Sequence, residues 1–161
     1  MLGVDYVVRE LNNAQNIYAP ICIAIIGGAV SSVALPVFAK QFETNGVATN
    51  GTDPVAYFKM SKPVRGSADH AFNWNGVTWH FASGENRQIF ERDPDKYASQ
   101  YGGHCAYAMS KEYIAPTVPE AWTIYEDRLY LNFTLRAREL WLQDVPGNIA
   151  LGDANWPKLR E

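Results

Sequence analysis

The sequence contains little cysteine, with only Cys22 and Cys105 among its 161 residues. Cys22 lies in an apolar N-terminal stretch, so removal of that stretch leaves a single thiol and excludes an intramolecular disulfide. Cys105 then has four possible roles. It can be a buried inert side chain, form an intermolecular disulfide, ligate a metal ion, or act as a reactive thiol.

An excess of basic charge is also absent. Lys and Arg total 14 against 17 Asp and Glu, and the formal net charge is −3. Because no basic stripe is present, we expect no nucleic-acid partner. Arg65, Arg87, Arg136 and Arg138 are scattered, which is typical of solvated surface charges.

The common enzyme signatures are missing as well. There is no nucleophile elbow, phosphate-binding loop, His-Glu-x-x-His zinc motif or Cys-x-x-Cys pair. The chain is nevertheless 47% hydrophobic and 13% aromatic, which is enough apolar material for a packed core without a cofactor. These features favour a protein that is not an enzyme.

One long apolar run is present near the N-terminus. No charged residue occurs between Glu10 and Lys40, and residues 17–39 are mostly Ile, Val, Ala and Leu. The pattern predicts that residues 1–39 are a signal peptide cleaved after Ala39 or an uncleaved membrane anchor. Val37 and Ala39, the minus-three and minus-one positions of such a cut, are small residues and favour cleavage. We therefore expect an exported, periplasmic or secreted protein, or one held to the membrane only through residues 17–39.

Residues 40–52 are rich in Asn, Gly and Thr and show no apolar period, so we expect a linker there. Asp53-Pro54 then predicts a helix start, because Asp caps free N–H groups and Pro fits the first turn. In residues 71–81, two runs in which aromatic residues alternate with other residues flank Asn75-Gly76. Asn-Gly is the preferred pair for a tight hairpin turn.

A second hairpin is predicted across residues 121–133, with Glu126-Asp127 at its turn. Ser83 and Thr134 are expected to cap helices. Residues 148–156 are expected to form a last short helix. The pattern predicts one α+β domain at residues 53–157, with a small antiparallel sheet built from the two hairpins and short helices packed on it.

Several linked motifs in this order resemble the exported single-domain bacterial members of the YHS-domain family. They are Asp53-Pro54-Val55-Ala56-Tyr57-Phe58, Trp79-His80-Phe81-Ala82-Ser83, Phe90 with Asp93-Pro94-Asp95-Lys96-Tyr97, Tyr101-Gly102-Gly103-His104-Cys105-Ala106-Tyr107 and Asp153-Ala154-Asn155-Trp156-Pro157. The resemblance implies an association with metal handling, because short modules of this family attached to copper-transporting ATPases carry cysteines thought to bind metal. The matching places here hold Ala56, Ala82 and roughly Asn86, so that thiolate cluster is absent.

The most plausible reactive centre is His104-Cys105, where an imidazole and a thiolate could ligate copper or zinc. The adjacent Gly102 and Gly103 permit a tight loop around such a site. His80 is a further candidate donor, since strand alternation separates it from its neighbours Trp79 and Phe81. His70, Met60 and Met109 could complete the set.

Two alternatives to metal binding are open. Cys105 could serve a thiol redox protein or enzyme, provided that a base lowers the pKa of its thiol. The chain could also be a non-catalytic module that binds a small molecule or protein and whose cysteine is structural. Tyr101 and Tyr107 flank the loop, and such aromatic side chains more often fill a core than line a pocket.

Overall fold

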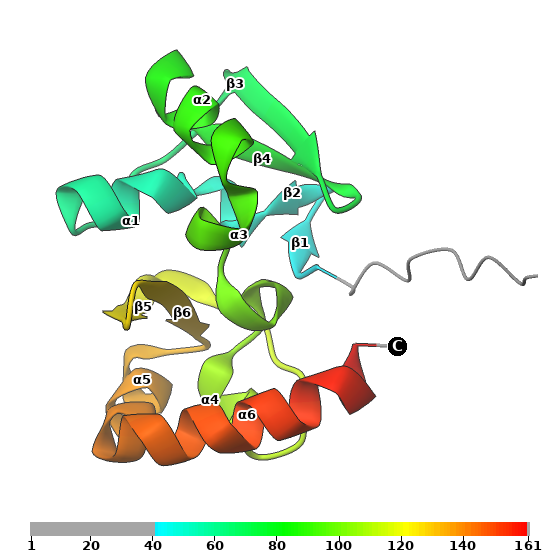
Figure 1. Cartoon of the computed structure of the whole chain (residues 1–161), viewed down its shortest axis with the longest axis vertical. Helices are drawn as coiled ribbons and strands as arrows, with labels where there is room; N and C mark the ends of the chain where they lie inside the picture. The colour runs from blue at the N-terminus through cyan, green and yellow to red at the C-terminus, as the bar shows by residue number, and fades with distance from the viewer. Residues whose placement is uncertain (1–40, 161) are drawn as a thin grey trace, which may run out of the picture. The chain divides into compact units, whose positions relative to one another are not determined.

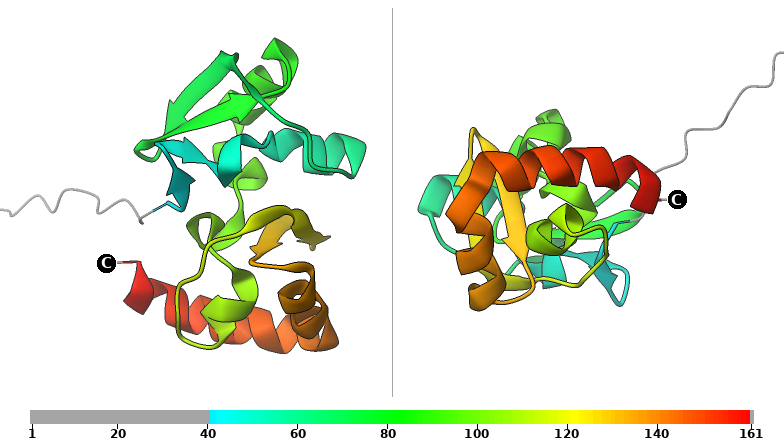
Figure 2. Two further views of the ribbon diagram at one scale, coloured as in Figure 1. Left: turned by 180° about the vertical axis from the view of Figure 1, so that it is seen from behind. Right: turned by 90° about the horizontal axis from the view of Figure 1, so that it is seen from below.

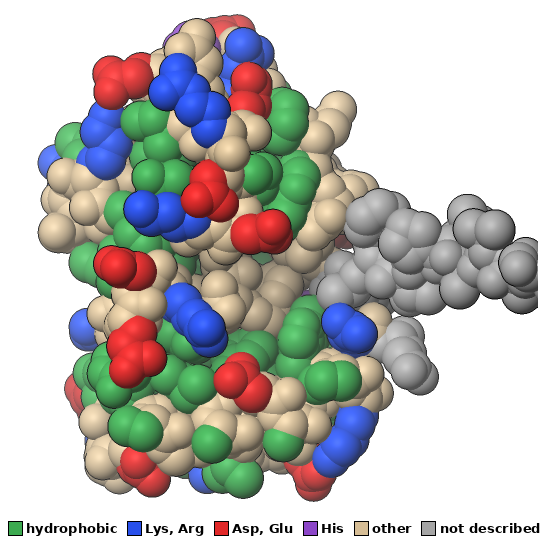
Figure 3. All heavy atoms as spheres, viewed as in Figure 1, with side chains coloured by type: hydrophobic (Ala, Val, Ile, Leu, Met, Phe, Trp, Pro, Cys, Tyr) green, Lys and Arg blue, Asp and Glu red, His purple; other side chains and the backbone are tan. Residues whose placement is uncertain are grey.

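The structure is a computed structural model that describes residues 41–160, all within one compact unit. The predicted leader and its cleavage site lie outside the described residues. Within residues 41–160, no helix combines the length and the apolar character needed to cross a membrane. On the face shown in Figure 3, acidic and basic side chains are interspersed rather than gathered by sign.

The first half of the domain is a four-stranded sheet with helices against it (Figure 1). The strand order is β1-β2-β4-β3. The strands are β1 (Glu43–Thr44), β2 (Val47–Ala48), β3 (Ser67–Trp74) and β4 (Val77–Phe81). The accompanying helices are η1 (Thr49–Gly51), α1 (Pro54–Met60), α2 (Gly84–Arg92) and α3 (Pro94–Tyr97).

The second half is a two-stranded hairpin with helices on the side away from the first sheet (Figure 1). Its elements are η2 (Gln100–Gly103), α4 (Ala106–Ser110), β5 (Val118–Tyr125), β6 (Arg128–Asn132), α5 (Leu135–Trp141), η3 (Leu142–Asp144) and α6 (Val145–Leu159). The long helix α6 packs across α4, as both views of Figure 2 show.

Aromatic rings fill the core of each half. Phe90 of α2 contacts Trp79 and Phe81 of β4, with ring centroids 4.9 and 5.1 Å apart. In the second half, Tyr130 packs on Trp141 at 5.0 Å. All five side chains are almost fully buried. Because aromatic side chains bury the largest apolar areas, these clusters account for much of the stability.

The predicted α+β class and both predicted hairpins are confirmed. The turn at Asn75-Gly76 has φ of 50° and 78°, and the turn at Glu126-Asp127 has φ of 47° and 56°. The two hairpins do not share one sheet, however, and the first sheet is not purely antiparallel, because β2 pairs in parallel with β4. The Asp53, Ser83 and Thr134 side chains cap helices as predicted.

The segment predicted as a linker forms part of the first sheet. Asn45-Gly46 makes a tight turn with φ of 54° and 79°, and β1 pairs antiparallel with β2 on either side of it. This is the same Asn-Gly signal that predicted the hairpin at residues 71–81. Its two flanking strands have only two residues each, too few to produce an apolar period.

The last helix is longer than the predicted residues 148–156. It begins at Val145 because the Asp144 side chain accepts the Gly147 N–H at 3.0 Å and Pro146 lies in the first turn. Proline lacks an N–H, which the first turn does not need. Pro157 lies inside α6, but only two residues before the helix ends.

Candidate functional site

The glycine loop is a tight left-handed turn. Tyr101, Gly102 and Gly103 have φ of 54°, 60° and 82°, a region that glycine occupies easily and a bulky side chain does not. Any side chain at Gly103 would also bring a Cβ within 3.1 Å of the Ser99 hydroxyl. The Phe42 N–H donates to the Gly102 carbonyl at 2.7 Å. The loop therefore turns the chain inward just before His104 and Cys105.

Cys105 caps helix α4 from a buried position. Its side chain is 1% exposed, and its sulfur accepts the Ala108 N–H at 3.4 Å. The same sulfur lies 3.6 Å from Oδ1 of the fully buried Asn132, which also accepts the Tyr107 N–H at 3.0 Å. These contacts tie the start of α4 to strand β6. They describe a structural cysteine at a helix N-terminus.

The remaining side chains of the loop contact aromatic rings and charged groups. The buried His104 ring lies near Phe42 and Trp156, with centroids 5.8 and 6.0 Å away. Tyr101 donates from its hydroxyl to Asp153 at 3.0 Å. Tyr107 is half-buried, and the Lys111 ammonium lies 5.2 Å from its ring centroid. Each of the two tyrosines that flank the loop is therefore in contact with a charged side chain, Asp153 for Tyr101 and Lys111 for Tyr107.

Burial is the main cause that raises the pKa of Tyr101 above its ordinary value of 10.0, and the neighbouring Asp153 carboxylate adds to it. Burial likewise raises the pKa of Tyr57. Above pH 10 the unfolded chain releases protons that the folded chain retains, so the free energy of unfolding should fall as pH rises beyond about 10. Urea unfolding between pH 8 and 11 measures this slope. A Tyr57→Phe/Tyr101→Phe variant should show a shallower slope, and an unchanged slope would contradict the assignment.

The predicted metal donors are not gathered into one site. Within residues 41–160, no three His, Cys, Asp or Glu side chains lie close enough together to hold a metal ion. His80 lies in strand β4 and lines a surface pocket, and Cys105 is not among the residues of that pocket. His80, His104 and Cys105 therefore do not form a three-donor centre of the kind that zinc requires.

The burial of Cys105 predicts a thiol that reagents cannot reach in the native protein. We expect iodoacetamide to alkylate Cys105 at least about a hundredfold more slowly in folded than in urea-unfolded protein, because reaction requires local opening. Peptide mass spectrometry separates Cys105 from Cys22 in this measurement. Rapid native alkylation at Cys105 would instead support the thiol redox alternative.

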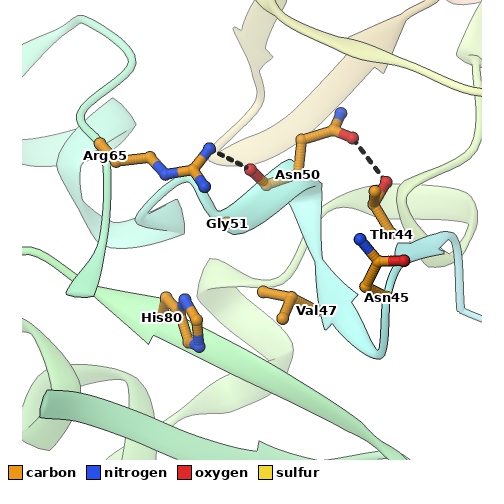
Figure 4. Close-up of a pocket in the computed structure, with 7 residues that line it drawn as sticks. All are labelled: Thr44, Asn45, Val47, Asn50, Gly51, Arg65 and His80. Atoms are coloured by element: carbon orange, nitrogen blue, oxygen red, sulfur yellow. Dashed lines mark hydrogen bonds between the residues drawn. The ribbon is translucent and has the colours of Figure 1, made fainter. Parts of the chain in front are cut away.

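A pocket lies between the β1–β2 hairpin and strand β4 (Figure 4). Its volume is about 320 Å³, within the range of small-molecule sites. The lining residues are Thr44, Asn45, Val47, Asn50, Gly51, Arg65 and His80. Figure 4 shows Arg65 and Asn50 along one side, with His80 and Val47 opposite them.

Close backbone contacts hold Arg65 and His80 on this pocket. A Cβ on Gly66 would lie 2.4 Å from the carbonyl carbon of His80, so only glycine lets the two segments approach this closely. The Arg65 guanidinium donates to the Asn50 carbonyl at 2.9 Å and passes over Gly51, where a Cβ would lie 3.3 Å from it. The two glycines therefore set the distance between the walls of the pocket.

Thr49, beside the pocket-lining Asn50 in η1, has a strained backbone conformation. Its φ is 50°, and a β-branched residue is unusual in this left-handed region. A hydrogen bond from the Thr49 hydroxyl to the Thr52 carbonyl, 2.7 Å long, compensates in part. Strained backbone of this kind concentrates at ligand sites, so the adjacent pocket is a candidate ligand site.

A second polar cluster surrounds the buried carboxylate of Asp53. One oxygen accepts the N–H groups of Val55 and Ala56, and the other accepts the Ala82 N–H at 2.9 Å and the Asn86 amide at 2.6 Å. Ala56, Ala82 and roughly Asn86 occupy the places that match the cysteines of the short metal-binding modules named above. In this chain they meet at a carboxylate that joins α1, the residue after β4, and α2.

Sequence reasoning missed most of the pocket. Arg65 was interpreted as a scattered surface charge, and Thr44, Asn45 and Asn50 fell in the presumed linker. The Asn45-Gly46 turn signal could have located the hairpin that carries Thr44 and Asn45, with Asn50 just beyond it in η1. Only His80 was selected, and for a different site.

The fold is a small α+β domain with a surface pocket beside its four-stranded sheet. Residues 53–101 match the family model described as YHS domain, so the chain contains a YHS domain. The match covers α1 through the start of the glycine loop, the first part of the predicted range 53–157. No curated protein and no solved structure gives a significant match to the chain.

Proposed function

We propose that this YHS-domain protein is a non-catalytic binding module that holds a small polar ligand in the pocket between the β1–β2 hairpin and β4. The observation that carries the proposal is the pairing of Arg65 and His80 across a cavity of about 320 Å³. Asn50 is already oriented, because it accepts the Thr44 hydroxyl at 2.8 Å and donates to the Thr117 carbonyl at 2.7 Å. Groups fixed before binding lose little entropy when a ligand arrives.

The arrangement around Cys105 supports binding without catalysis. Its sulfur has an amide and a side-chain contact inside the core and is 1% exposed. A substrate could reach it only after local opening of the fold. A pocket on the surface needs no such rearrangement.

Transition-metal binding at Cys105, His104 and His80 is the competing proposal, with copper or zinc as the ion. Its support is the association of YHS domains with metal handling, while the positions of the three side chains weigh against it. Titration of the full-length protein with Cu(I) and Zn(II) tests it. Tight binding that disappears in Cys105→Ser would favour the metal site over the pocket.

The pocket proposal is tested by thermal unfolding of full-length protein with a panel of small carboxylates, phosphate esters, amides and sugars. Val47→Phe fills the cavity, whereas Cys105→Ser leaves it intact. A ligand should raise Tm in the wild type and in Cys105→Ser and should have little effect in Val47→Phe. Stabilisation that is independent of Val47, or none with any compound, would overturn the proposal.

Export is also part of the proposal, through cleavage of the apolar segment after Ala39. N-terminal sequencing of secreted or periplasmic protein should then begin at or near Lys40. A full-length product that needs detergent would favour the membrane anchor.

A further inference from the structure

We propose that the pocket selects small organic oxyanions, carboxylates or phosphate esters, through the Arg65 guanidinium with His80 as a second donor. This inference rests on the proposed binding function and names the ligand class of that site. None of the seven lining residues is acidic, so the charge that faces the cavity is positive.

The Arg65 guanidinium has N–H donors left with which to bind an anion. A guanidinium carries five N–H donors in a planar fork that matches two oxygens of a carboxylate or phosphate. One of these donors is assigned, to the Asn50 carbonyl at 2.9 Å. Among the residues that the structure describes, no Asp or Glu forms an ion pair with Arg65.

The nearest acidic residue of the hairpin is already occupied. The Glu43 carboxylate accepts the Gly46 N–H within the β1–β2 turn. It is not among the residues lining the pocket. Glu43 therefore stabilises the turn and leaves Arg65 available.

The opposite wall adds a second donor and keeps the geometry fixed. The imidazole of His80 offers an N–H in either protonation state. Strand alternation places it on the side of β4 opposite the buried Trp79 and Phe81. Gly66 holds this strand against the segment that carries Arg65, since a Cβ there would collide with His80. The two donors thus face one cavity from strand β4 and from the segment before β3, which the close contact at Gly66 holds together.

Malonate and malonamide test the inference, because they have similar shapes and differ in charge. Titration calorimetry on the full-length protein should show malonate binding at least about tenfold more tightly than malonamide. Arg65→Gln should weaken malonate binding at least about tenfold and leave malonamide unchanged. Arg65→Lys keeps the charge but loses the fork, so its affinity should fall between the two. Circular dichroism checks that each variant is folded.

Arg92→Gln is the matched control, since Arg92 is also exposed and lies on α2, outside the pocket. It should change malonate affinity by less than about twofold, because Arg92 does not line the pocket and exposed charges are screened by salt. Equal loss in both Arg→Gln variants, or no binding of malonate and inorganic phosphate, would overturn the anion inference. Equal binding of malonate and malonamide would also overturn it, but would leave the proposed pocket function standing if Val47→Phe abolishes both.

Discussion

Replacement of Asp53 by alanine should destabilise the domain by about 3 to 5 kcal/mol, since it removes a helix cap and leaves buried donors without partners. Its carboxylate is fully buried and accepts hydrogen bonds from α1, from the residue after β4 and from α2. Asn86 lies 2.6 Å from it and would lose its partner inside the core. Urea denaturation measures the change in the free energy of unfolding.

Asp93→Ala is a matched control, because Asp93 also precedes a proline and also caps a helix. Its carboxylate is exposed and accepts the Lys96 N–H at 3.3 Å. We expect a loss of about 0.5 to 1 kcal/mol, the ordinary contribution of a solvated cap. Equal losses in the two variants would show that the Asp53 carboxylate does not join the three elements.

Gly66→Ala should destabilise the protein by about 3 kcal/mol or more and should also weaken ligand binding in the pocket. The added Cβ would lie 2.4 and 2.5 Å from the backbone carbon and oxygen of His80, and backbone atoms cannot move aside as a flexible side chain can. Separation of the two strands would then move Arg65 away from His80. Thermal unfolding and malonate titration measure the two effects.

Gly84→Ala provides the comparison for this substitution. The nearest heavy atom to its added Cβ is 4.0 Å away, at the first position of α2, so we expect a change within about 0.5 kcal/mol. A stable Gly66→Ala with unaltered malonate affinity would contradict the close approach of the two strands.

Local chemistry made much of the fold predictable. Asn75-Gly76 determined a hairpin, and Asp53, Ser83 and Thr134 marked helix starts, because each effect depends on residues within one turn. The parallel pairing of β2 with β4 was not predictable in this way. It joins Val47 to Thr78, residues far apart in the sequence, and follows from tertiary contacts instead.

The candidate site shows the same division. The sequence identified the glycine loop correctly as a tight turn, but the side chains it carries face the core. Cys105 is a helix cap and Tyr101 an internal hydrogen-bond donor. The pocket depends on Arg65 and Asn50, which meet because η1, directly after the β1–β2 hairpin, passes beside the segment that carries Arg65. Neither residue belongs to a motif.

The residues that a ligand contacts test most directly whether the pocket at Arg65 and His80 is the binding site. Malonate titrated into ¹⁵N-labelled full-length protein should shift the amide resonances of Asn45, Gly51 and His80, while those of Cys105 and Asn132 stay in place. Shifts centred on Cys105 and α4, with none around Arg65, would contradict it.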